Sequence, residues 1–491
     1  MTEPTAPIEL NGTSSRFTSP TRQPDARLVA RLEGICETIT SDTETAEASR
    51  DWWPLAMHWS LTGSVGQRAG AICRPTTTQH VADVLVQCSA AGVPVTAAGG
   101  RSGVSGASIP AFGGVILDLT AMQGIIEIDA VAGVVEVWAG TFGPDLETEL
   151  RRQCAMTIGH FPQSFDIATV GGWVACRGAG QFSTRYGKID EMVVGLEVVL
   201  ADGTVIRTGT GPAAAMGSDL THLFLGSEGT LGVITRIWLR AHPVPTHERR
   251  AAYTFANFES GIEACRLILR RGATPAVLRL YDEVETQRSH GGDGKRCALL
   301  VLDEGDIGLV EATIGVVEDE CAAASPASDD LVAQWLVHRN ETHALQDLTR
   351  KGFVVDTMEI AAPWSRLPTI FVEARAALTA VPHARVASCH LSHSYLDGAC
   401  LYFTFAAAPP PDQIDATYVA MWDAGQRAVL AAGGNLSHHH GIGLNRARFM
   451  AEALGSSLGV LQAVKDALDP GGILNPGKLG LSSPFGAVSW P

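Results

Sequence analysis

One stretch of the chain carries more glycine than a regular helix or strand tolerates. Residues 159–187 read GHFPQSFDIATVGGWVACRGAGQFSTRYG and contain six glycines and one proline. Glycine loses much backbone entropy on folding, so such a cluster needs a reason, usually a positive φ angle or close contact of the backbone with another group. Its short donors and positive charges are Thr169, Ser183, Thr184, Arg177 and Arg185. We therefore predict an irregular segment that holds a large, flat, anionic cofactor mainly through main-chain N–H groups.

Two further glycine-rich loops lie on either side of this stretch. Residues 99–106 (GGRSGVSG) follow a short predicted strand. Residues 226–235 (GSEGTLGVIT) lead into a second predicted strand, whose successive side chains alternate between its two faces. The first loop lacks the GxGxxG spacing that a doubly wound dinucleotide-binding fold needs after its first strand. We expect the three loops to lie in one α+β unit over residues 68–242.

Length, charge and cysteine content narrow the class of protein. The 491 residues suggest about three domains. A net charge of −16 argues against nucleic acid as a partner, because phosphate binding needs basic patches. No uncharged apolar run approaches the roughly 18 residues that span a bilayer, and no secretory signal precedes the first unit. The ten cysteines include no CxxC pair, which indicates reduced thiols in a cytoplasmic protein rather than a disulfide framework or zinc site.

Hydrophobic periodicity predicts the elements of the first unit. One helix is expected to end at Gly92, because apolar side chains recur before it at i, i+3, i+4 and i+7: Val81, Val84, Leu85 and Cys88. A second helix is expected over 144–153. Strands are expected at 115–119, 125–128, 134–138, 193–200, 204–207 and 233–240.

The pattern changes near residues 242–245 (HPVP), where we expect a second unit with helices covering an antiparallel sheet. Its expected strands are 276–280, 297–302 and 401–405. Its expected helices are 258–271, about 306–350, and 414–432, with a last helix at 455–468. Residues 1 to about 25 are rich in Thr, Ser and Pro and are expected to form a flexible arm, and the last ten or so residues are expected to be loose.

The order of the three loops, together with DPGGILNPGKL at 469–479, resembles the FAD-linked oxidase branch of the vanillyl-alcohol oxidase (PCMH-type) superfamily. Within it, the chain is most similar to the alkyldihydroxyacetonephosphate synthase family. The matching pieces are GHxPxS with TVGGW in the first stretch, VLRLYD (277–282), APW (362–364), DGACLYFTF (397–405) and SHHHG (437–441). The resemblance covers about residues 70–480.

The resemblance implies an α+β fold, with a two-subdomain PCMH-type FAD-binding domain and an α+β cap domain with an antiparallel sheet. The expected limits are an N-terminal arm and helical segment at 1–67, the FAD-binding domain at 68–245, the cap or substrate domain at 246–435, and a C-terminal segment at 436–491 that returns to the FAD domain.

The resemblance also implies which residues contact FAD. They are Ala97, Ala98, Gly99, Gly100, Arg101, Ser102 and Gly103 in the first loop; Gln163, Ser164, Phe165, Asp166, Ile167, Ala168 and Thr169, then Cys176, Arg177, Gly178 and Ala179, in the second; and Glu228, Gly229, Thr230, Leu231, Gly232, Val233 and Ile234 in the third. The loop at 99–106 holds no histidine that would form a covalent bond to flavin, so we expect non-covalent FAD.

The catalytic residues that the resemblance implies are Tyr402 for proton transfer, the active-site histidines His438, His439 and His440, and Arg279. The residues by themselves leave other interpretations open. The histidine run also fits a polar surface loop, and Tyr402 a strand aromatic packed in a core. Arg279 alternates with apolar neighbours, as a solvent-facing strand residue does.

The synthase reaction exchanges the acyl chain of an acyl-dihydroxyacetone phosphate for a fatty alcohol, through a flavin N5 adduct and without net redox change. The alternative is an FAD-linked oxidase or dehydrogenase of a 2-hydroxy acid or alcohol, and a third hypothesis is a catalytically inactive flavin-binding protein. One departure concerns phosphate binding. The phosphate-binding arginine of the synthase family falls at Leu345 here, and Arg339 and Arg350 are out of register.

We expect no metal, although His390, His393 and His438 offer a zinc site as an alternative. The glutamate that metal-dependent relatives place in an EHG triplet is a histidine in this chain. The expected partner is a small, lipid-like substrate, with no nucleic acid and no transmembrane segment. Peripheral membrane contact and a homodimer are left open.

Overall fold

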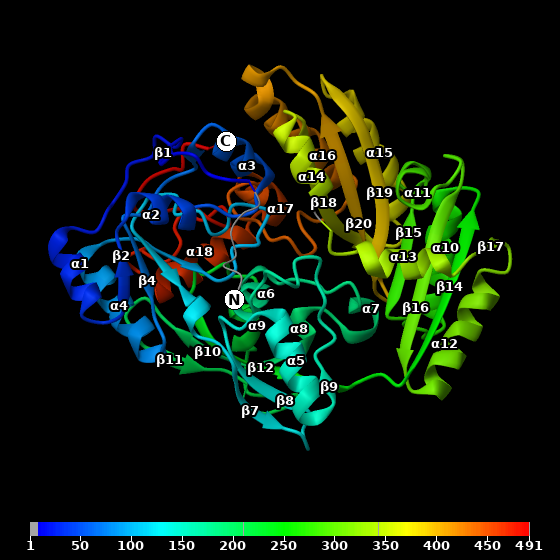
Figure 1. The fold of residues 1–491 in the computed structure, drawn as a ribbon, viewed down its shortest axis with the longest axis horizontal. Coiled ribbons are helices and arrows are strands. Elements are labelled where there is room, and N and C mark those ends of the chain that lie inside the picture. Colours follow the sequence, from blue (N-terminus) through cyan, green and yellow to red (C-terminus); the bar gives the residue numbers. More distant parts are fainter. Residues whose placement is uncertain (1–7, 210, 342, 491) are drawn as a thin grey trace.

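The computed structural model describes residues 8–209, 211–341 and 343–490 and shows an α+β fold (Figure 1). Two smaller sheets form one side of the molecule and a seven-stranded sheet with its helices forms the other, while the C-terminal segment, red in Figure 1, lies back against the N-terminal part. The predicted α+β class is confirmed, whereas the domain limits remain predictions. Within the described ranges, no helix is both long and apolar enough to cross a membrane.

A four-stranded sheet opens the fold, in the order β2 (Glu37–Ile39), β4 (Ala71–Arg74), β6 (Val115–Asp118) and β5 (Val95–Ala98). Helix α4 (Thr78–Ala91) packs on it and ends at Gly92, which takes a left-handed φ of 60°. The predicted face of Val81, Val84, Leu85 and Cys88 is buried. The C-terminal segment joins this sheet, because the amide of Val95 donates to the carbonyl of Ile473 and Asn475 donates back to Val95.

A five-stranded antiparallel sheet follows, in the order β11 (Val205–Arg207), β10 (Val193–Val199), β12 (Val233–Arg240), β8 (Val134–Trp138) and β7 (Ile125–Asp129). Short strands β9 (Met156–Thr157) and β13 (His242–Pro243) pair beside it. Its helices are α5 (Gly143–Cys154), α6 (Val170–Cys176), α7 (Ser183–Tyr186), α8 (Ile189–Met192) and α9 (Leu220–Phe224), with a 3₁₀ turn at Leu119–Ala121.

The prediction that residues 159–187 are irregular throughout is wrong, because this stretch contains α6 and α7. Thr169 starts α6 by accepting a hydrogen bond from the amide of Gly172, and Arg177 ends it with a left-handed φ of 59°. Gly171 lets the helix pack closely at the end of β8, since a Cβ there would fall 2.8 Å from the carbonyl oxygen of Ala139, the residue after that strand. The glycines therefore serve close packing as well as the loop.

The seven-stranded antiparallel sheet has the order β17 (Ser325–Ala327), β14 (His247–Phe255), β16 (Cys297–Gly305), β15 (Val277–Tyr281), β19 (Ala384–Ser394), β20 (Gly398–Ala407) and β18 (Val354–Pro363). Its helices are α10 (Phe258–Arg270), α11 (Glu283–His290), α12 (Ile307–Glu320), α13 (Asp330–His338), α14 (His343–Arg350), α15 (Leu367–Ala380) and α16 (Ile414–Ala431), and a 3₁₀ turn lies at Pro411–Gln413.

The expected helical stretch at 306–350 is also wrong, because it divides into α12, the edge strand β17, α13 and α14. Cys321 ends α12, and Pro326 lies in β17, where an edge position tolerates its missing N–H. Sequence periodicity missed β14, β18 and β19 altogether.

Both ends of the described chain are packed rather than loose, contrary to the prediction. Ile8 and Phe17 are buried, and β1 (Ser14–Ser15) pairs with β3 (Ser64–Val65). The amides of Thr18 and Ser19 donate to the hydroxyl of Ser489. The remaining N-terminal helices are α1 (Ala26–Glu33), α2 (Asp42–Ala48) and α3 (Pro54–Leu61), and the last helices are α17 (Met450–Leu454) and α18 (Ser457–Leu468), after a 3₁₀ turn at Ala447–Phe449.

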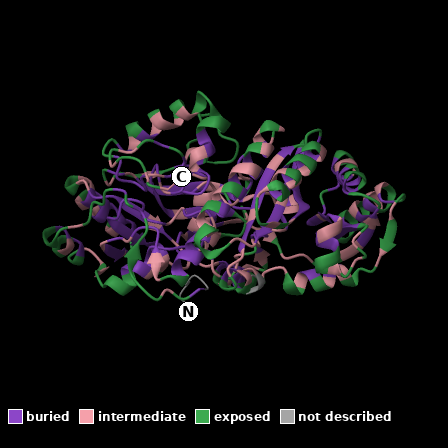
Figure 2. Ribbon diagram, turned by 90° about the horizontal axis from the view of Figure 1, so that it is seen from above, coloured by how far each residue is buried: buried purple, intermediate pink, exposed green. Residues whose placement is uncertain are grey.

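The seven-stranded sheet has two different faces. Helices α10, α12, α15 and α16 cover one face, and their apolar side chains form a single core with strand residues such as Leu280, Leu401 and Ile360. Buried residues accordingly gather in the strands and on the inner faces of the helices (Figure 2). The alternate strand residues lie on the second face.

Candidate active site

A row of side chains crosses four neighbouring strands on the second face of the seven-stranded sheet. Tyr281 of β15 pairs with His390 of β19, and His390 pairs with Tyr402 of β20. Tyr402 in turn pairs with Glu359 of β18. Residues directly opposite each other in an antiparallel sheet share a face, so these four side chains lie in one line.

The loop at 436–446, which carries the histidine run, lies next to this row. The ring centroid of Tyr402 is 6.0 Å from that of His439 and 5.6 Å from that of His440. The ring of His390 stacks on Tyr402 at 4.7 Å. The hydroxyl of Tyr402 donates to that of Thr357 at 3.1 Å. The structure thus brings Tyr402 together with two of the three predicted histidines.

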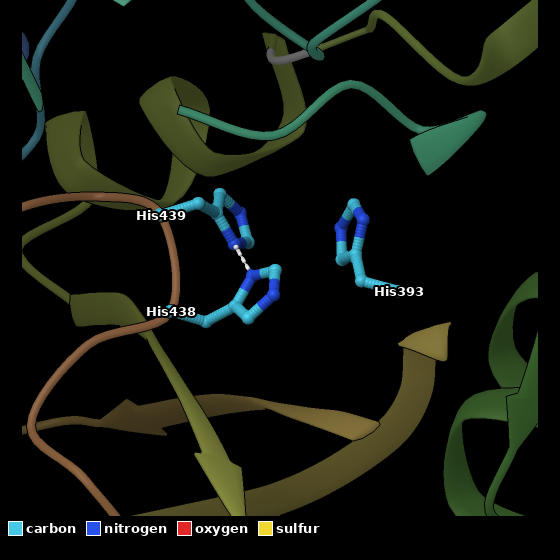
Figure 3. Close-up of side chains that lie close together, drawn as sticks. All are labelled: His393, His438 and His439. Atoms are coloured by element: carbon cyan, nitrogen blue, oxygen red, sulfur yellow. Dashed lines mark hydrogen bonds between the residues drawn. The ribbon is translucent and has the colours of Figure 1, made fainter. Parts of the chain in front are cut away.

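His438 belongs to a second group of rings. His393, His438 and His439 lie close together (Figure 3), with ring centroids 4.9 Å apart for His393 and His438 and 5.0 Å apart for His393 and His439. The Nδ1 atoms of His438 and His439 are 2.8 Å apart. His390, one of the three residues of the alternative zinc site, is instead hydrogen-bonded to Glu285.

Glu359 fixes the histidine loop to the sheet. It is fully buried, and its carboxylate accepts hydrogen bonds from the amides of His439 at 3.0 Å and His440 at 2.7 Å. The Ser437 hydroxyl and the buried Arg446 guanidinium also donate to it. Nδ1 of His440 lies 3.3 Å from the same carboxylate. Burial alone would raise the pKa of Glu359, but Arg446 and His440 outweigh burial and hold that pKa well below its usual value.

A second carboxylate holds the same loop from the opposite side. Glu228, predicted as an FAD contact, accepts hydrogen bonds from the amides of Ile442 at 2.6 Å and Gly443 at 2.9 Å. Lys188 donates to the carbonyl of His438 at 2.6 Å. The loop is therefore fastened both to the seven-stranded sheet and to the third glycine-rich loop, and this leaves the Glu228 side chain occupied.

Arg279 lies on the same face of the sheet as Tyr402 but two strands away. Its Nε donates to the Tyr281 hydroxyl at 2.6 Å, and its guanidinium lies 5.8 Å from the Trp335 ring. Among the described residues, no hydrogen bond or ion pair joins Arg279 to Tyr402 or to the histidine loop. Arg339 lies 5.9 Å from the same Trp335 ring and donates to Gln181. Leu345 lies within α14, so no arginine occupies that position.

Burial sets the protonation of these groups. It lowers the pKa of His393, His438 and His439 well below the ordinary value, so the three imidazoles are neutral near pH 7. It lowers the pKa of His390 to about 4. Burial raises the pKa of Tyr402, which therefore keeps its proton. The site offers a phenol donor beside neutral imidazoles, which can accept a proton.

The three glycine-rich loops contact one another. A Cβ on Gly99 would lie 2.2 Å from Oγ1 of Thr169, and one on Gly100 would lie 2.0 Å from the carbonyl oxygen of Ile167. The third loop is bonded to α6, because the amide of Glu228 donates to the carbonyl of Ala175 at 2.9 Å. The segments 97–103, 163–169, 176–179 and 228–234, which hold the predicted FAD residues, therefore lie next to one another.

Polar atoms in this region suit a polar cofactor. Several buried side-chain atoms of the described residues have no hydrogen-bond partner: both ring nitrogens of His160, Nε1 of Trp173, Oγ of Ser227 and Oδ1 of Asn475. Buried polar groups are nearly always paired, so these atoms are available to bond the polar groups of a ligand. Arg177, by contrast, is occupied by an ion pair with Asp190 at 2.9 Å. These features fit FAD held mainly by backbone groups.

Family models for the "FAD binding domain" and the "FAD linked oxidases, C-terminal domain" match residues 69–209 and 244–479. An uncharacterized FAD-linked oxidoreductase, YgcU of Escherichia coli K12, is 33% identical over 432 residues, covering 83% of this chain and 88% of that protein. The chain belongs to the FAD-linked oxidase family.

Other similarities of this FAD-linked oxidase are more distant. An alkyldihydroxyacetonephosphate synthase of Dictyostelium discoideum is 27% identical over 456 residues, covering 85% of this chain and 74% of that protein. A solved structure of an alkyldihydroxyacetonephosphate synthase aligns with a TM-score of 0.77 and 24% identity, over 96% of this chain and 88% of that one, which shows the shared fold. The predictions of the PCMH-type fold, of FAD as cofactor and of an enzyme are confirmed.

Sequence reasoning missed most of the residues that hold the site together, and it predicted Glu228 only as an FAD contact. Glu359 and Glu228 fasten the histidine loop, Tyr395 bonds to His438 within it, Ser183 bonds to His393, and Lys188 supports the loop. One signal was present for Glu359, since an acid in an otherwise apolar strand is costly unless it is paired. The others were not visible, because their partners lie far away in the sequence.

Proposed function

We propose that this FAD-linked oxidase catalyses a reaction of the alkyldihydroxyacetonephosphate synthase type. The substrates are an acyl-dihydroxyacetone phosphate and a fatty alcohol, and the products are the alkyl ether and a fatty acid. The observation that supports the proposal is the position of Tyr402 in β20. Its ring lies beside that of His440, and Glu359 fixes the loop that carries His440. Two of the motifs that resemble the synthase family, DGACLYFTF with Tyr402 and SHHHG with His440, lie side by side here.

The side chains have distinct tasks in this proposal. FAD, when bound, supplies an electrophilic ring that exchanges electron pairs with the substrate carbon. Tyr402 transfers the proton that leaves or returns to that carbon. His440 lies next to Tyr402, and its contact with Glu359 through Nδ1 leaves the other ring nitrogen to exchange the proton. Arg279 carries the planar, bidentate charge that suits a phosphate or carboxylate.

A second candidate is an FAD-linked oxidase or dehydrogenase of a 2-hydroxy acid or alcohol. Leu345 favours it, because the synthase-type phosphate arginine is absent from that position. The E. coli relative at 33% identity is also named an oxidoreductase. Removal of a hydride from an alcohol carbon needs the same flavin and the same proton-transfer residue, so Tyr402 and His440 would keep their roles.

Anaerobic mixing of the purified yellow enzyme with each substrate class separates the two reactions. Formation of an alkyl ether from palmitoyl-dihydroxyacetone phosphate and hexadecanol, without an electron acceptor, supports the synthase-type reaction. Bleaching of the flavin by lactate, glycolate or 2-hydroxyglutarate, with no ether product, refutes it in favour of the dehydrogenase. A colourless protein that releases no flavin on denaturation refutes both.

A further inference from the structure

We propose that Arg339 and Arg279 together bind one anionic group of the substrate, a phosphate or a carboxylate, next to Trp335. The guanidinium of Arg279 lies 5.8 Å from the Trp335 ring, and that of Arg339 lies 5.9 Å from the same ring. Arg279 bonds to the Tyr281 hydroxyl and Arg339 to Gln181, and among the described residues neither arginine forms an ion pair. The inference rests on the proposed function and deepens it, because it assigns a place to the charged end of the substrate.

The acidic side chains near the two arginines do not neutralise them. Glu304 is buried and accepts a hydrogen bond from the Tyr186 hydroxyl at 2.7 Å. Glu285 is buried and paired with Arg288 at 3.2 Å, and Asp166 is exposed to solvent. A half-buried cation without a counter-charge is costly, so a pair of them is suited to an anion that arrives with the substrate.

Residues next to α7 hold the guanidinium of Arg339 in place. The Gln181 side chain donates to the carbonyl of Arg339 at 3.2 Å and accepts from its Nη1 at 3.1 Å. The guanidinium lies 5.1 Å from the ring of Phe182 and 5.6 Å from that of Phe161. Trp335 precedes Arg339 by one helical turn, so the two share a face of the helix. A guanidinium stacked on aromatic rings keeps its edge available for two parallel hydrogen bonds.

A third polar group faces Arg279 across the sheet. Tyr281 of β15 pairs with His390 of β19 in an antiparallel register, so the next residues on the same face of the two strands are Arg279 and Ser392. Ser392 is 5% exposed, and its hydroxyl has no hydrogen-bond partner among the described residues. Buried hydroxyls are nearly always paired, so this one is available to donate to an anion beside Arg279.

The donor set indicates what the substrate must carry. Guanidinium groups match the planar fork of a carboxylate or the oxygens of a phosphate, and a neutral alcohol offers no such partner. Arg279 shares the sheet face of Tyr402, two strands away, so an anion held here would anchor a substrate whose reacting carbon extends toward Tyr402. Arg339 lies just after α13, at a different point of the chain from Leu345 in α14. It is therefore a specificity-determining residue of this chain for either proposed reaction.

Anion binding is measured by isothermal titration of the full-length, FAD-loaded enzyme in phosphate-free buffer. The probes are inorganic phosphate and oxalate, which stand for the two anionic groups and do not react. We expect the unmodified enzyme to bind at least one of them, and Arg339→Gln to bind the same anion about 10–100-fold more weakly, because it loses charge-assisted hydrogen bonds. The control Arg271→Gln changes an arginine that is 42% exposed and paired with Asp319, and it should bind as the unmodified enzyme does.

Two gentler variants keep the test decisive if Arg339→Gln loses its flavin. Arg339→Lys keeps the charge without the planar fork and should bind the anion more tightly than Arg339→Gln but more weakly than the unmodified enzyme. Ser392→Ala leaves both arginines in place and should weaken binding about 3–10-fold.

The inference is overturned if the unmodified enzyme binds neither phosphate nor oxalate. It is equally overturned if Arg339→Gln with its flavin retained, or both gentler variants, bind the anion as tightly as the unmodified enzyme does. Weakened anion binding in Arg339→Gln, together with no ether product from the unmodified enzyme, supports this inference and refutes only the synthase-type reaction.

Discussion

Replacement of Glu359 by Gln tests whether one buried charge holds the histidine loop. Glu359 and Arg446 are both fully buried, and the carboxylate also accepts from the amides of His439 and His440. Glutamine keeps the size but removes the charge, so Arg446 becomes a buried cation without a counter-charge. Breaking a buried ion pair by removing one partner costs about 3–5 kcal/mol.

Hydrogen exchange measured by mass spectrometry reports this cost locally. In the unmodified enzyme, the amides of residues 439–443 are bonded to Glu359, Ser437 or Glu228 and should exchange slowly. A loss of about 3–5 kcal/mol corresponds to an increase in exchange rate of about two to four orders of magnitude, since each 1.36 kcal/mol is tenfold. Turnover should fall in the same variant, because His440 is no longer held beside Tyr402.

Two comparisons show whether charge is the cause. Glu311→Gln removes a carboxylate that is 45% exposed and paired with Arg249, and this change should leave the exchange of residues 439–443 unaltered, because an exposed ion pair contributes little to stability. Glu359→Gln combined with Arg446→Met removes both buried charges and should recover much of the protection. Unchanged exchange of residues 439–443 in Glu359→Gln refutes a loop held by charge, and so does a double variant that exchanges as fast as the single one.

Three further predictions concern the site. Tyr402→Phe should reduce turnover at least ~100-fold while the flavin-to-protein absorbance ratio stays constant. A loss of flavin would show instead that Tyr402 has a structural role. Burial lowers the pKa of His160 to about 3, so the unfolded chain takes up a proton that the folded chain does not as pH falls below about 6.5. His160 should therefore lower the free energy of unfolding by about 2 kcal/mol at pH 5. His160→Phe should remove this part of the pH dependence of stability, as measured by denaturant titration. An unchanged pH dependence would show that His160 does not cause it. Acid precipitation should leave all FAD in the supernatant, and flavin that stays with the pellet would show a covalent bond.

The sequence predicted the first unit well because local patterns determine it. Helix α4 has a clean apolar face and a glycine at its end, and in β12 buried side chains alternate with more exposed ones from Thr235 to Arg240. The glycine loops were recognised for the same reason. Helix α6 was missed because its glycines lower helix propensity, and packing against Ala139 outweighs that preference.

The seven-stranded sheet was less predictable because long-range pairing determines it. The sequence of β18 shows no regular alternation of polar and apolar residues. Its acidic residue Glu359 is paired with Arg446, which lies 87 residues later in the chain. Motifs predicted Tyr402 and His440 as catalytic residues, whereas the one signal for Glu359, an acid in an otherwise apolar strand, does not tell which groups it bonds. The packing of the chain ends was hidden in the same way, since Ser19 and Ser489 are 470 residues apart.

A crystal structure of the enzyme with bound FAD is the most direct test of the roles proposed for Tyr402 and His440. We expect the flavin ring to lie between the three glycine-rich loops and the row of Tyr281, His390 and Tyr402, with its reactive edge in contact with Tyr402 and His440. A flavin ring bound elsewhere, with Tyr402 separated from it by other side chains, would refute these roles.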